Sequence, residues 1–203
     1  MRLYNEAMIS CVLLSAGLSQ RFGSPKALAE LGGKTVIEHL QSIFIQSKAD
    51  EIIIVLGDAA EQIKPLILDH KKVKLVYNKD YILGQTSSFK AGLRAISKDA
   101  AGMMLHPIDV PLVKAASIDL IIHQFEKSLP DILIPTHNGH KGHPPVFHAK
   151  NKKALLAFSD AKGLNEFEHE HAAETSLFNV DDPGICRSFN TKEEFEEIKK
   201  SFV

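Results

Sequence analysis

Two cations and two glycines follow a short apolar run near the start of the sequence, and these residue types suit a polyphosphate. Arg21 and Lys26 supply positive charge, arginine as a planar fork of donors and lysine as a mobile point charge. Gly17 and Gly23 allow tight turns and a close approach of ligand to backbone, because neither carries a Cβ. The preceding run, residues 9–14, suits a buried parallel strand. The segment therefore predicts a loop that holds a triphosphate.

This loop fits neither of two common phosphate-binding motifs. A P-loop needs a glycine directly before Lys-Ser/Thr, whereas here Pro25 precedes Lys26 and Ala27 follows it. The dinucleotide motif needs three closely spaced glycines at the start of a helix, and the segment from Gly17 to Gly23 does not supply them.

The loop resembles the signature L-x-A-G-x-S-x-R-x-G-x-x-K of the MobA-like NTP transferases, and within them it is most similar to the molybdenum cofactor cytidylyltransferases. Every fixed position is present, at Leu14, Ala16, Gly17, Ser19, Arg21, Gly23 and Lys26. The resemblance implies a three-layer, Rossmann-like α/β fold with a mostly parallel central sheet. It also implies that these residues bind a nucleotide and that Lys26 and Arg21 act in catalysis.

The composition is that of an ordinary globular protein and argues against two kinds of partner. Among 203 residues, 24 basic side chains balance 25 acidic ones, for a formal net charge of −1. Nucleic-acid-binding proteins usually carry a clear basic excess, so no nucleic acid is expected. No apolar stretch approaches the length of a membrane span, and residues 1–6 lack the core of a signal peptide. We therefore expect a cytoplasmic protein without membrane association.

Strand-like and helix-like segments alternate over most of the chain. Strands are expected at residues 9–14, 51–57, 73–77, 101–105, 131–134 and 145–147, and helices at 35–47, 59–69, 87–97, from after 111 to about 127, and within 188–203. This alternation predicts a parallel sheet with helices on both faces, which binds ligands outside the carboxyl ends of its strands. No linker or repeat interrupts the pattern, so residues 1–203 are expected to form one domain.

A carboxylate follows the fourth predicted strand, in the sequence His106-Pro107-Ile108-Asp109-Val110-Pro111. The prolines on both sides of Asp109 restrict the backbone, and a carboxylate at a strand end is well placed to hold a metal. An aspartate in a loop is more often a solvated turn residue. The family resemblance favours the functional reading, because the position matches the family's metal-binding aspartate, which also takes part in catalysis.

A second metal ligand is expected near the end of the chain. The segment Asn190-Thr191-Lys192-Glu193-Glu194 resembles the family's closing motif, with Asn190 in the ligand position and Lys192 in place of the usual proline. An asparagine oxygen is a weaker metal ligand than a carboxylate. Alternatively, Asn190 or Thr191 simply caps the last helix, and both roles are compatible.

Two further segments resemble the family's substrate contacts. Asn78 and the glycine–hydroxyl turn from Gly84 to Ser88 resemble the segment beside the nucleotide base, although Ser87 in it reads more simply as a helix cap. His143 lies in Gly142-His143-Pro144-Pro145-Val146-Phe147, which resembles a segment that borders the acceptor pocket. A later family segment is only partly kept: Asp160 and Gly163 are present, but its arginine is missing.

The resemblance implies a Mg²⁺-dependent nucleotidyltransferase that moves CMP from CTP to the phosphate of a molybdopterin-type cofactor and releases pyrophosphate. CTP is favoured because Ala16 precedes Gly17, where the guanylyltransferase branch typically has Gly-Gly. One alternative is a pyrophosphorylase that acts on a sugar or alditol phosphate. Another is a non-catalytic nucleotide-binding partner of a molybdoenzyme, and a molybdoenzyme is in any case a possible partner.

Overall fold

An eight-stranded sheet forms the middle layer of the computed structural model, which describes residues 7–202. Its strands are β1 (Met8–Ser15), β4 (Glu51–Leu56), β5 (Val73–Tyr77), β6 (Ala100–Pro107), β7 (Ile132–His137), β8 (His140–Lys141), β9 (Val146–His148) and β10 (Thr175–Asn179). The strand order is β10-β7-β9-β6-β1-β4-β5, and β8 pairs with β7. A separate hairpin joins β2 (Glu30–Leu31) to β3 (Lys34–Thr35).

The sheet is mostly parallel, as predicted. Strand β1 pairs in parallel with β4 and β6, β4 with β5, and β7 with β10. Strand β9 runs antiparallel between β6 and β7. Because the parallel strands share one direction, the carboxyl ends of β1, β4, β5 and β6 lie at one edge of the layer.

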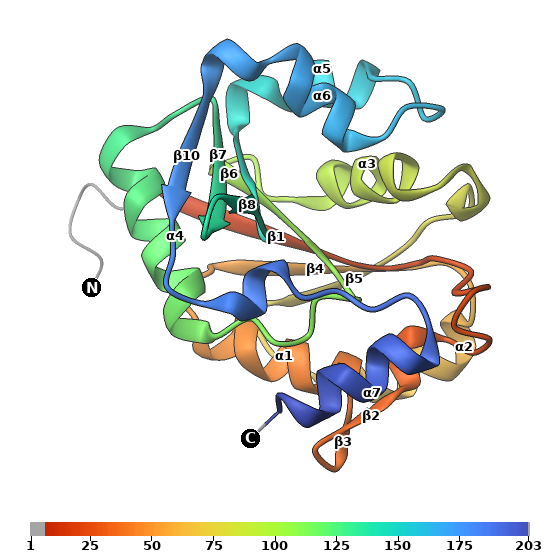
Figure 1. Ribbon diagram of the computed structural model, residues 1–203. Coiled ribbons are helices and arrows are strands. Elements are labelled where there is room, and N and C mark those ends of the chain that lie inside the picture. The colour runs from red at the N-terminus through yellow and green to blue at the C-terminus, as the bar shows by residue number, and fades with distance from the viewer. Residues whose placement is uncertain (1–6, 203) are drawn as a thin grey trace.

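Helices cover both faces of the sheet (Figure 1). On one face lie α1 (Val36–Gln46), α4 (Ala115–Ser128) and α7 (Lys192–Lys200), and on the other α3 (Gln85–Ala95), α5 (Lys152–Ala157) and α6 (Leu164–Glu170). Alternate residues of β1 serve the two layers: Cys11 and Leu13 pack with the first group of helices, and Val12 and Leu14 with the second. The predicted three-layer, Rossmann-like fold is confirmed.

A glycine sets how closely α3 approaches the sheet. A Cβ added at Gly92 would lie 2.3 Å from a methyl carbon of Val12 and 3.1 Å from one of Val55. Only a residue without a side chain fits there. As a result α3 lies directly on β1 and β4, and its N-terminus reaches the edge where those strands end (Figure 1, right).

Several segments depart from the predicted elements, among them α5 and α6, where no helix was predicted. The helix expected over residues 59–69 is a single turn, α2 (Ala60–Ile63), followed by a 3₁₀ turn at Lys64–Leu66. Pro65 explains the break, because it has no N–H to continue the α-helical hydrogen bonds. Strand β10 was not predicted, since its residues Thr175–Asn179 do not form an apolar run.

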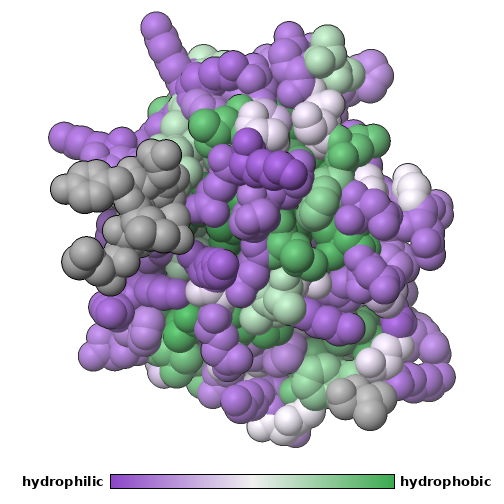
Figure 2. Space-filling view, turned by 90° about the vertical axis from the view of Figure 1, so that its left-hand side faces the viewer, coloured by the Kyte–Doolittle hydropathy of each residue, from purple (hydrophilic) through white to green (hydrophobic). Residues whose placement is uncertain are grey.

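The face of the molecule shown in Figure 2 is largely hydrophilic. Seen from the left-hand side of Figure 1, apolar residues lie in small groups among charged and polar ones (Figure 2). No helix within residues 7–202 has both the length and the apolar character that crossing a bilayer requires. The segment at 1–6, which entered the expectation about a signal peptide, lies outside the described residues.

Candidate active site

A cleft of about 580 Å³ lies at the carboxyl ends of β1, β4 and β6. Nine of the residues that the sequence singles out line it: Leu14, Ala16, Gly17, Ser19, Lys26, Gly84, Ser88, Asp109 and His143. A hollow of about 220 Å³ shares Ser19 and Lys26 with the cleft and is also lined by Arg21 and Asn190. Gly23 and Asn78 line neither space. The cleft and the hollow together form the candidate site.

Four of these side chains converge on one point of the site. The ammonium of Lys26 donates to Asp109 Oδ2 at 2.8 Å and to Asn190 Oδ1 at 3.0 Å. The guanidinium of Arg21 donates to the same Asn190 oxygen at 2.9 Å. These residues come from the loop after β1, the end of β6 and the segment before α7. The fold thus joins cations and oxygen ligands that are up to 169 positions apart in sequence.

The backbone around Lys26 is fixed before any ligand binds. Lys26 begins a 3₁₀ turn after Pro25, and its N–H donates to the Ser19 hydroxyl at 3.2 Å. The Lys26 ammonium lies 5.4 Å from the centre of the Phe189 ring. Phe189 packs in turn against Phe22, with ring centres 5.2 Å apart. The aromatic contacts hold the loop against the C-terminal segment and place the Lys26 ammonium at the edge of the cleft.

The two glycines of the loop differ in what they do. Gly23 has φ +79°, a left-handed conformation that favours glycine, so it is needed for the turn. Gly17 has no such conformation, and a Cβ added there would meet no protein atom within 4 Å. Neither packing nor backbone geometry within residues 7–202 requires a glycine at position 17. Since Gly17 lines the cleft, its bare backbone leaves room for a ligand to approach closely.

Asp109 and Asn190 suit a hard divalent cation. Their oxygens both lie within 3.0 Å of a single cationic atom, the Lys26 nitrogen, so they already face one positive centre. Magnesium typically takes one or two protein oxygen ligands and completes its shell with water and substrate phosphates. Residues 7–202 contain no group of three or more histidine, cysteine or carboxylate side chains that could hold a metal, so such an ion would depend on the phosphates.

Neighbouring residues of the closing motif have the two roles considered for it, helix cap and possible metal ligand. Thr191 caps α7: its hydroxyl accepts from the Glu194 N–H, and the Glu194 carboxylate accepts in return from the Thr191 N–H. Asn190 is therefore not the cap, and its side-chain oxygen faces Lys26 and Arg21. The cap fixes the start of the helix and with it the place of Asn190.

The N-terminus of α3 forms another wall of the cleft. Gly84 precedes the helix with φ +104°, and no side chain caps this end. Ser87, expected as the cap, instead donates to the carbonyls of Asp80 and Gly84. The Asn78 amide donates to the hydroxyls of Ser87 and Ser88, so Asn78 supports the wall from behind, whereas Gly84 and Ser88 line the cleft.

Two histidines lie side by side beneath the Asp109 loop, with ring centres 6.4 Å apart. His106 is fully buried, and its Nε2 lies 2.9 Å from the Val110 carbonyl oxygen, which ties the loop together. Burial, together with the neighbouring His143, lowers the pKa of His106 to about 3. Burial also lowers the pKa of His143, which lines the cleft, and Asp109 partly offsets this shift. The sequence interpretation of His106 as local structure agrees with its position.

Acid should destabilise the folded chain through His106. Between its folded pKa of about 3 and its ordinary value of 6.5, only the unfolded chain binds the proton, so the free energy of unfolding falls as pH drops below 6.5. At pH 5 this amounts to about 2 kcal/mol. Urea unfolding at pH 7 and pH 5 should show a smaller loss for His106→Gln than for the wild type. The exposed control His123→Gln should keep the wild-type loss; an equal loss in all three proteins contradicts this account.

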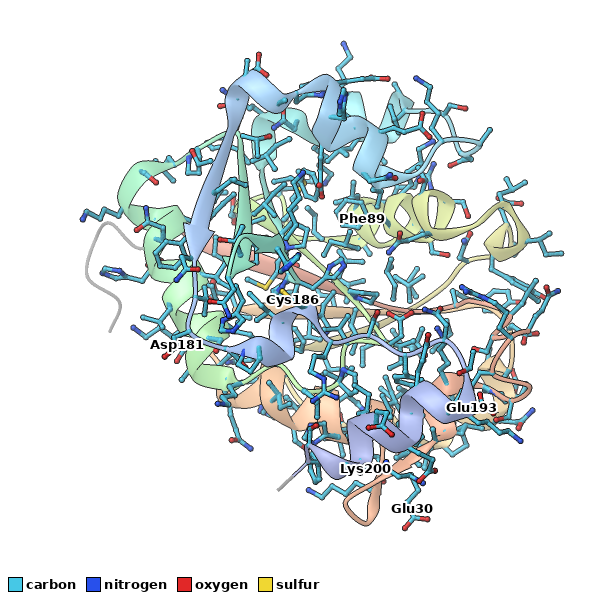
Figure 3. The ribbon with its side chains drawn as sticks, viewed as in Figure 1. Glu30, Phe89, Asp181, Cys186, Glu193 and Lys200 are labelled. Carbon is cyan, nitrogen blue, oxygen red and sulfur yellow. The ribbon has the colours of Figure 1, made fainter. Side chains whose placement is uncertain are left out.

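Several residues that the sequence did not single out also line the cleft: Asp58, Tyr81, Gln85, Lys141, Cys186 and Ser188. Asp58 directly follows β4 and its bridging glycine, so the rule that ligands bind at strand ends could have found it. Lys141 and Cys186 carried no such signal. The Cys186 thiol donates to the carbonyls of His140 and Lys141, and Cys186 lies near the middle of the view in Figure 3.

Comparison with known proteins finds relatives over nearly the whole chain. The family model of the MobA-like NTP transferase domain matches residues 11–175. A protein of Bacillus cereus (strain ATCC 10987 / NRS 248) named "Probable molybdenum cofactor guanylyltransferase" is 27% identical over 201 residues, which cover 93% of this chain and 94% of that protein.

Solved structures share the fold. Rv0371c from Mycobacterium tuberculosis H37Rv has a TM-score of 0.84 at 22% identity, covering 96% of this chain and 99% of that one. Its complex with manganese has a TM-score of 0.80 at 23% identity, with 96% and 98% covered. A nucleotidyl transferase from Methanothermobacter thermautotroptrophicus has a TM-score of 0.82 at 21% identity, with 96% and 97% covered.

The matched residues carry most of the candidate site. They include the loop with Arg21 and Lys26, the strand end with Asp109 and the turn with His143, while Asn190 lies beyond them. The family predicted from the signature loop is confirmed, and its members transfer nucleotides from nucleoside triphosphates. The chain is a nucleotidyltransferase and belongs to the MobA-like NTP transferase family.

Proposed function

We propose that this chain transfers CMP from CTP to the phosphate of a molybdopterin-type cofactor, with Mg²⁺ as the metal. The observation that carries the proposal is the convergence of Lys26 and Arg21 with two oxygen ligands, Asp109 and Asn190, at one corner of the cleft. That arrangement matches a metal-bound triphosphate in both charge and geometry. The molybdenum cofactor as acceptor is supported by the name of the Bacillus cereus relative.

The reaction is a phosphoryl substitution in which the protein supplies position and charge. An oxygen of the acceptor's phosphate attacks the α-phosphorus of CTP, a new P–O bond forms, and the bond to the β-phosphate oxygen breaks. Pyrophosphate leaves with the electron pair. Lys26 and Arg21 would neutralise the triphosphate and the charge that builds up around the α-phosphorus. Asp109 and Asn190 would hold Mg²⁺, whose positive charge would add to that stabilisation.

The attacking group needs no general base. A phosphate monoester has a second pKa of about 6, so it is largely a dianion at neutral pH. Nothing in the mechanism therefore requires His143 to remove a proton, and burial keeps that imidazole neutral by lowering its pKa. A neutral His143 can still donate or accept one hydrogen bond at the acceptor end of the site.

The preference for CTP rests on the end of the cleft beside α3. The Ala16 side chain lies on the α3 side of the sheet, in a cluster that Tyr81 also joins. A Cβ at Gly57 would lie 2.5 Å from Tyr81 and 2.7 Å from the Ala16 carbonyl oxygen, so the three residues pack tightly. Such packing supports a narrow base pocket and a pyrimidine. The neighbouring Asp58 carboxylate accepts hydrogen bonds only, which matches the amino group of cytosine and opposes O4 of uracil.

GTP is the second candidate, because the Bacillus cereus relative is named a guanylyltransferase. Guanine also carries an amino group that could donate a hydrogen bond to Asp58. This hydrogen bond alone therefore does not separate the two bases. We expect the two bases to be separated by size, because the Ala16 methyl group narrows the pocket.

Calorimetric titration of the four nucleoside triphosphates with Mg²⁺ tests the proposal. CTP should bind most tightly and should support pyrophosphate release with molybdopterin. Ala16→Gly should raise the affinity for GTP relative to CTP, about tenfold, because it removes one methyl group from the pocket wall. Ala27→Gly is the matched control, since Ala27 also lines the cleft and is buried. Tightest binding of GTP or ATP by the wild type would contradict the cytidylyl assignment and leave the nucleotidyltransferase intact.

A further inference from the structure

A second cation lines the cleft besides the one on the signature loop. Among the described residues that line it, only Lys26 and Lys141 carry a positive charge. Lys26 projects from the loop after β1, and Lys141 belongs to β8. A transfer between two phosphorylated substrates brings two groups of negative charge into this space. Lys26 already faces the metal ligands Asp109 and Asn190, which leaves Lys141 for the other substrate.

The backbone at Lys141 is held firmly from two sides. Lys141 pairs with Thr136 of β7, and the next N–H, that of Gly142, donates to the Pro135 carbonyl at 2.8 Å. A Cβ added at Gly142 would lie 2.7 Å from the Ile185 side chain, so this turn is pressed against the segment that carries Cys186. The Lys141 side chain is nevertheless 56% exposed. A fixed backbone with an exposed side chain suits a residue that reaches for a ligand.

The ion pair of Lys141 is loose enough to be exchanged. Its ammonium lies 3.4 Å from Glu168 Oε2 of α6, longer than the 2.7–2.9 Å of strong charge-assisted hydrogen bonds. Glu168 is only 14% exposed, and burial raises the pKa of its carboxyl group, an effect that Lys141 partly offsets. Glu168 therefore keeps the ammonium beside the cleft, while a phosphate dianion offers it a closer and more highly charged partner.

We infer that Lys141 binds the terminal phosphate of the acceptor and selects for phosphate monoesters. The inference rests on the proposed function, since it assigns the second substrate of that site. His143 lies two residues further on and lines the same cleft, and its buried Nδ1 has no hydrogen-bond partner among the described residues. Lys141 offers the incoming group a full charge, and the partly exposed His143 borders the same space.

Calorimetry with inorganic phosphate tests this assignment directly. The protein is first saturated with Mg²⁺ and the α,β-methylene analogue of the triphosphate that binds most tightly, which cannot be transferred. Lys141→Gln should weaken phosphate binding by about 10- to 100-fold, the effect of losing one hydrogen bond to a charged group. Lys141→Arg should restore it to within about threefold. Binding of the nucleotide analogue itself should stay unchanged in both variants.

Lys150→Gln is the matched control, because Lys150 has the same 56% exposure and a carboxylate partner, Asp131, but does not line the cleft.

A second experiment separates this inference from the proposed function: the same phosphate titration is carried out on a Lys26→Met background, without nucleotide. Phosphate binding that still depends on Lys141 there supports the inference even if no nucleotide binds. Equal phosphate affinity in Lys141→Gln and the wild type overturns it, as does no measurable phosphate binding or an equal loss in Lys150→Gln.

Discussion

Replacing Lys26 by methionine should slow pyrophosphate release by about 10²- to 10³-fold while the protein stays folded. Removing one preorganised charge from a phosphoryl-transfer site typically has an effect of this size. Methionine keeps an apolar side chain beside Phe189 but removes the ammonium that touches Asp109 and Asn190. Arg21→Ala should act in the same direction, since the Arg21 guanidinium reaches the same Asn190 oxygen.

Steady-state release of pyrophosphate with Mg²⁺, CTP and molybdopterin measures the effect, and the urea midpoint checks folding. Lys34→Met serves as control, because Lys34 is an exposed lysine on β3 that lines neither the cleft nor the hollow. If Lys26→Met turns over at nearly the wild-type rate, its assignment to the phosphates is wrong.

The regular part of the fold could be predicted because the residues of its buried strands are nearly all apolar. Every residue of β4 is buried, and all but Glu51 are apolar. The third predicted strand coincides with β5, whose residues are not buried but include the apolar Val73, Leu75 and Val76. Strand β9 was expected as a strand, but its antiparallel insertion between β6 and β7 depends on pairing between distant segments. No local pattern encodes such a pairing, because periodicity reports which face of an element is buried and not which neighbour it meets.

In the candidate site, too, some residues could be predicted from local sequence and others only from the fold. Loop residues such as Gly17 and Lys26 stand out because their types and spacing are unusual, and the structure brings them to the cleft. Asn78 has a side chain of the right type, yet its amide holds two serines and does not reach the cleft. Lys141 escaped notice because a lysine in a polar stretch resembles any solvated lysine. Lys141 lies on β8, which pairs with β7 across the Asn138-Gly139 turn. An Asn-Gly pair is a local signal for a hairpin, but it does not show that the hairpin borders the cleft.

Replacing Asp109 by asparagine should nearly abolish metal-dependent turnover, by about 10³-fold or more, whereas Asn190→Ala should reduce it only about tenfold. Asp109 brings a formal charge to the metal, and a metal at such a site supplies several kcal/mol of transition-state stabilisation. Asn190 brings only an amide dipole, whose loss is comparable to that of one ordinary hydrogen bond. Asparagine at position 109 keeps the size of the side chain, so the change isolates the charge.

Turnover is titrated with Mg²⁺, and Mn²⁺ binding is measured by electron paramagnetic resonance in the presence of a non-transferable CTP analogue. Together the two measurements distinguish a loss of metal binding from a loss of folding. Asp99→Asn is the control: Asp99 is exposed and precedes β6, so it places the same substitution at the opposite end of the strand that carries Asp109. Asn190→Asp should tighten Mn²⁺ binding, because it adds a second charge beside the first. Small and equal effects at positions 109 and 190 would mean that other groups hold the metal.

The Lys26 ammonium lies within hydrogen-bond distance of both oxygens, Asp109 Oδ2 and Asn190 Oδ1. A cation that entered there would have to displace the ammonium, and under the proposed function the triphosphate would become its new partner.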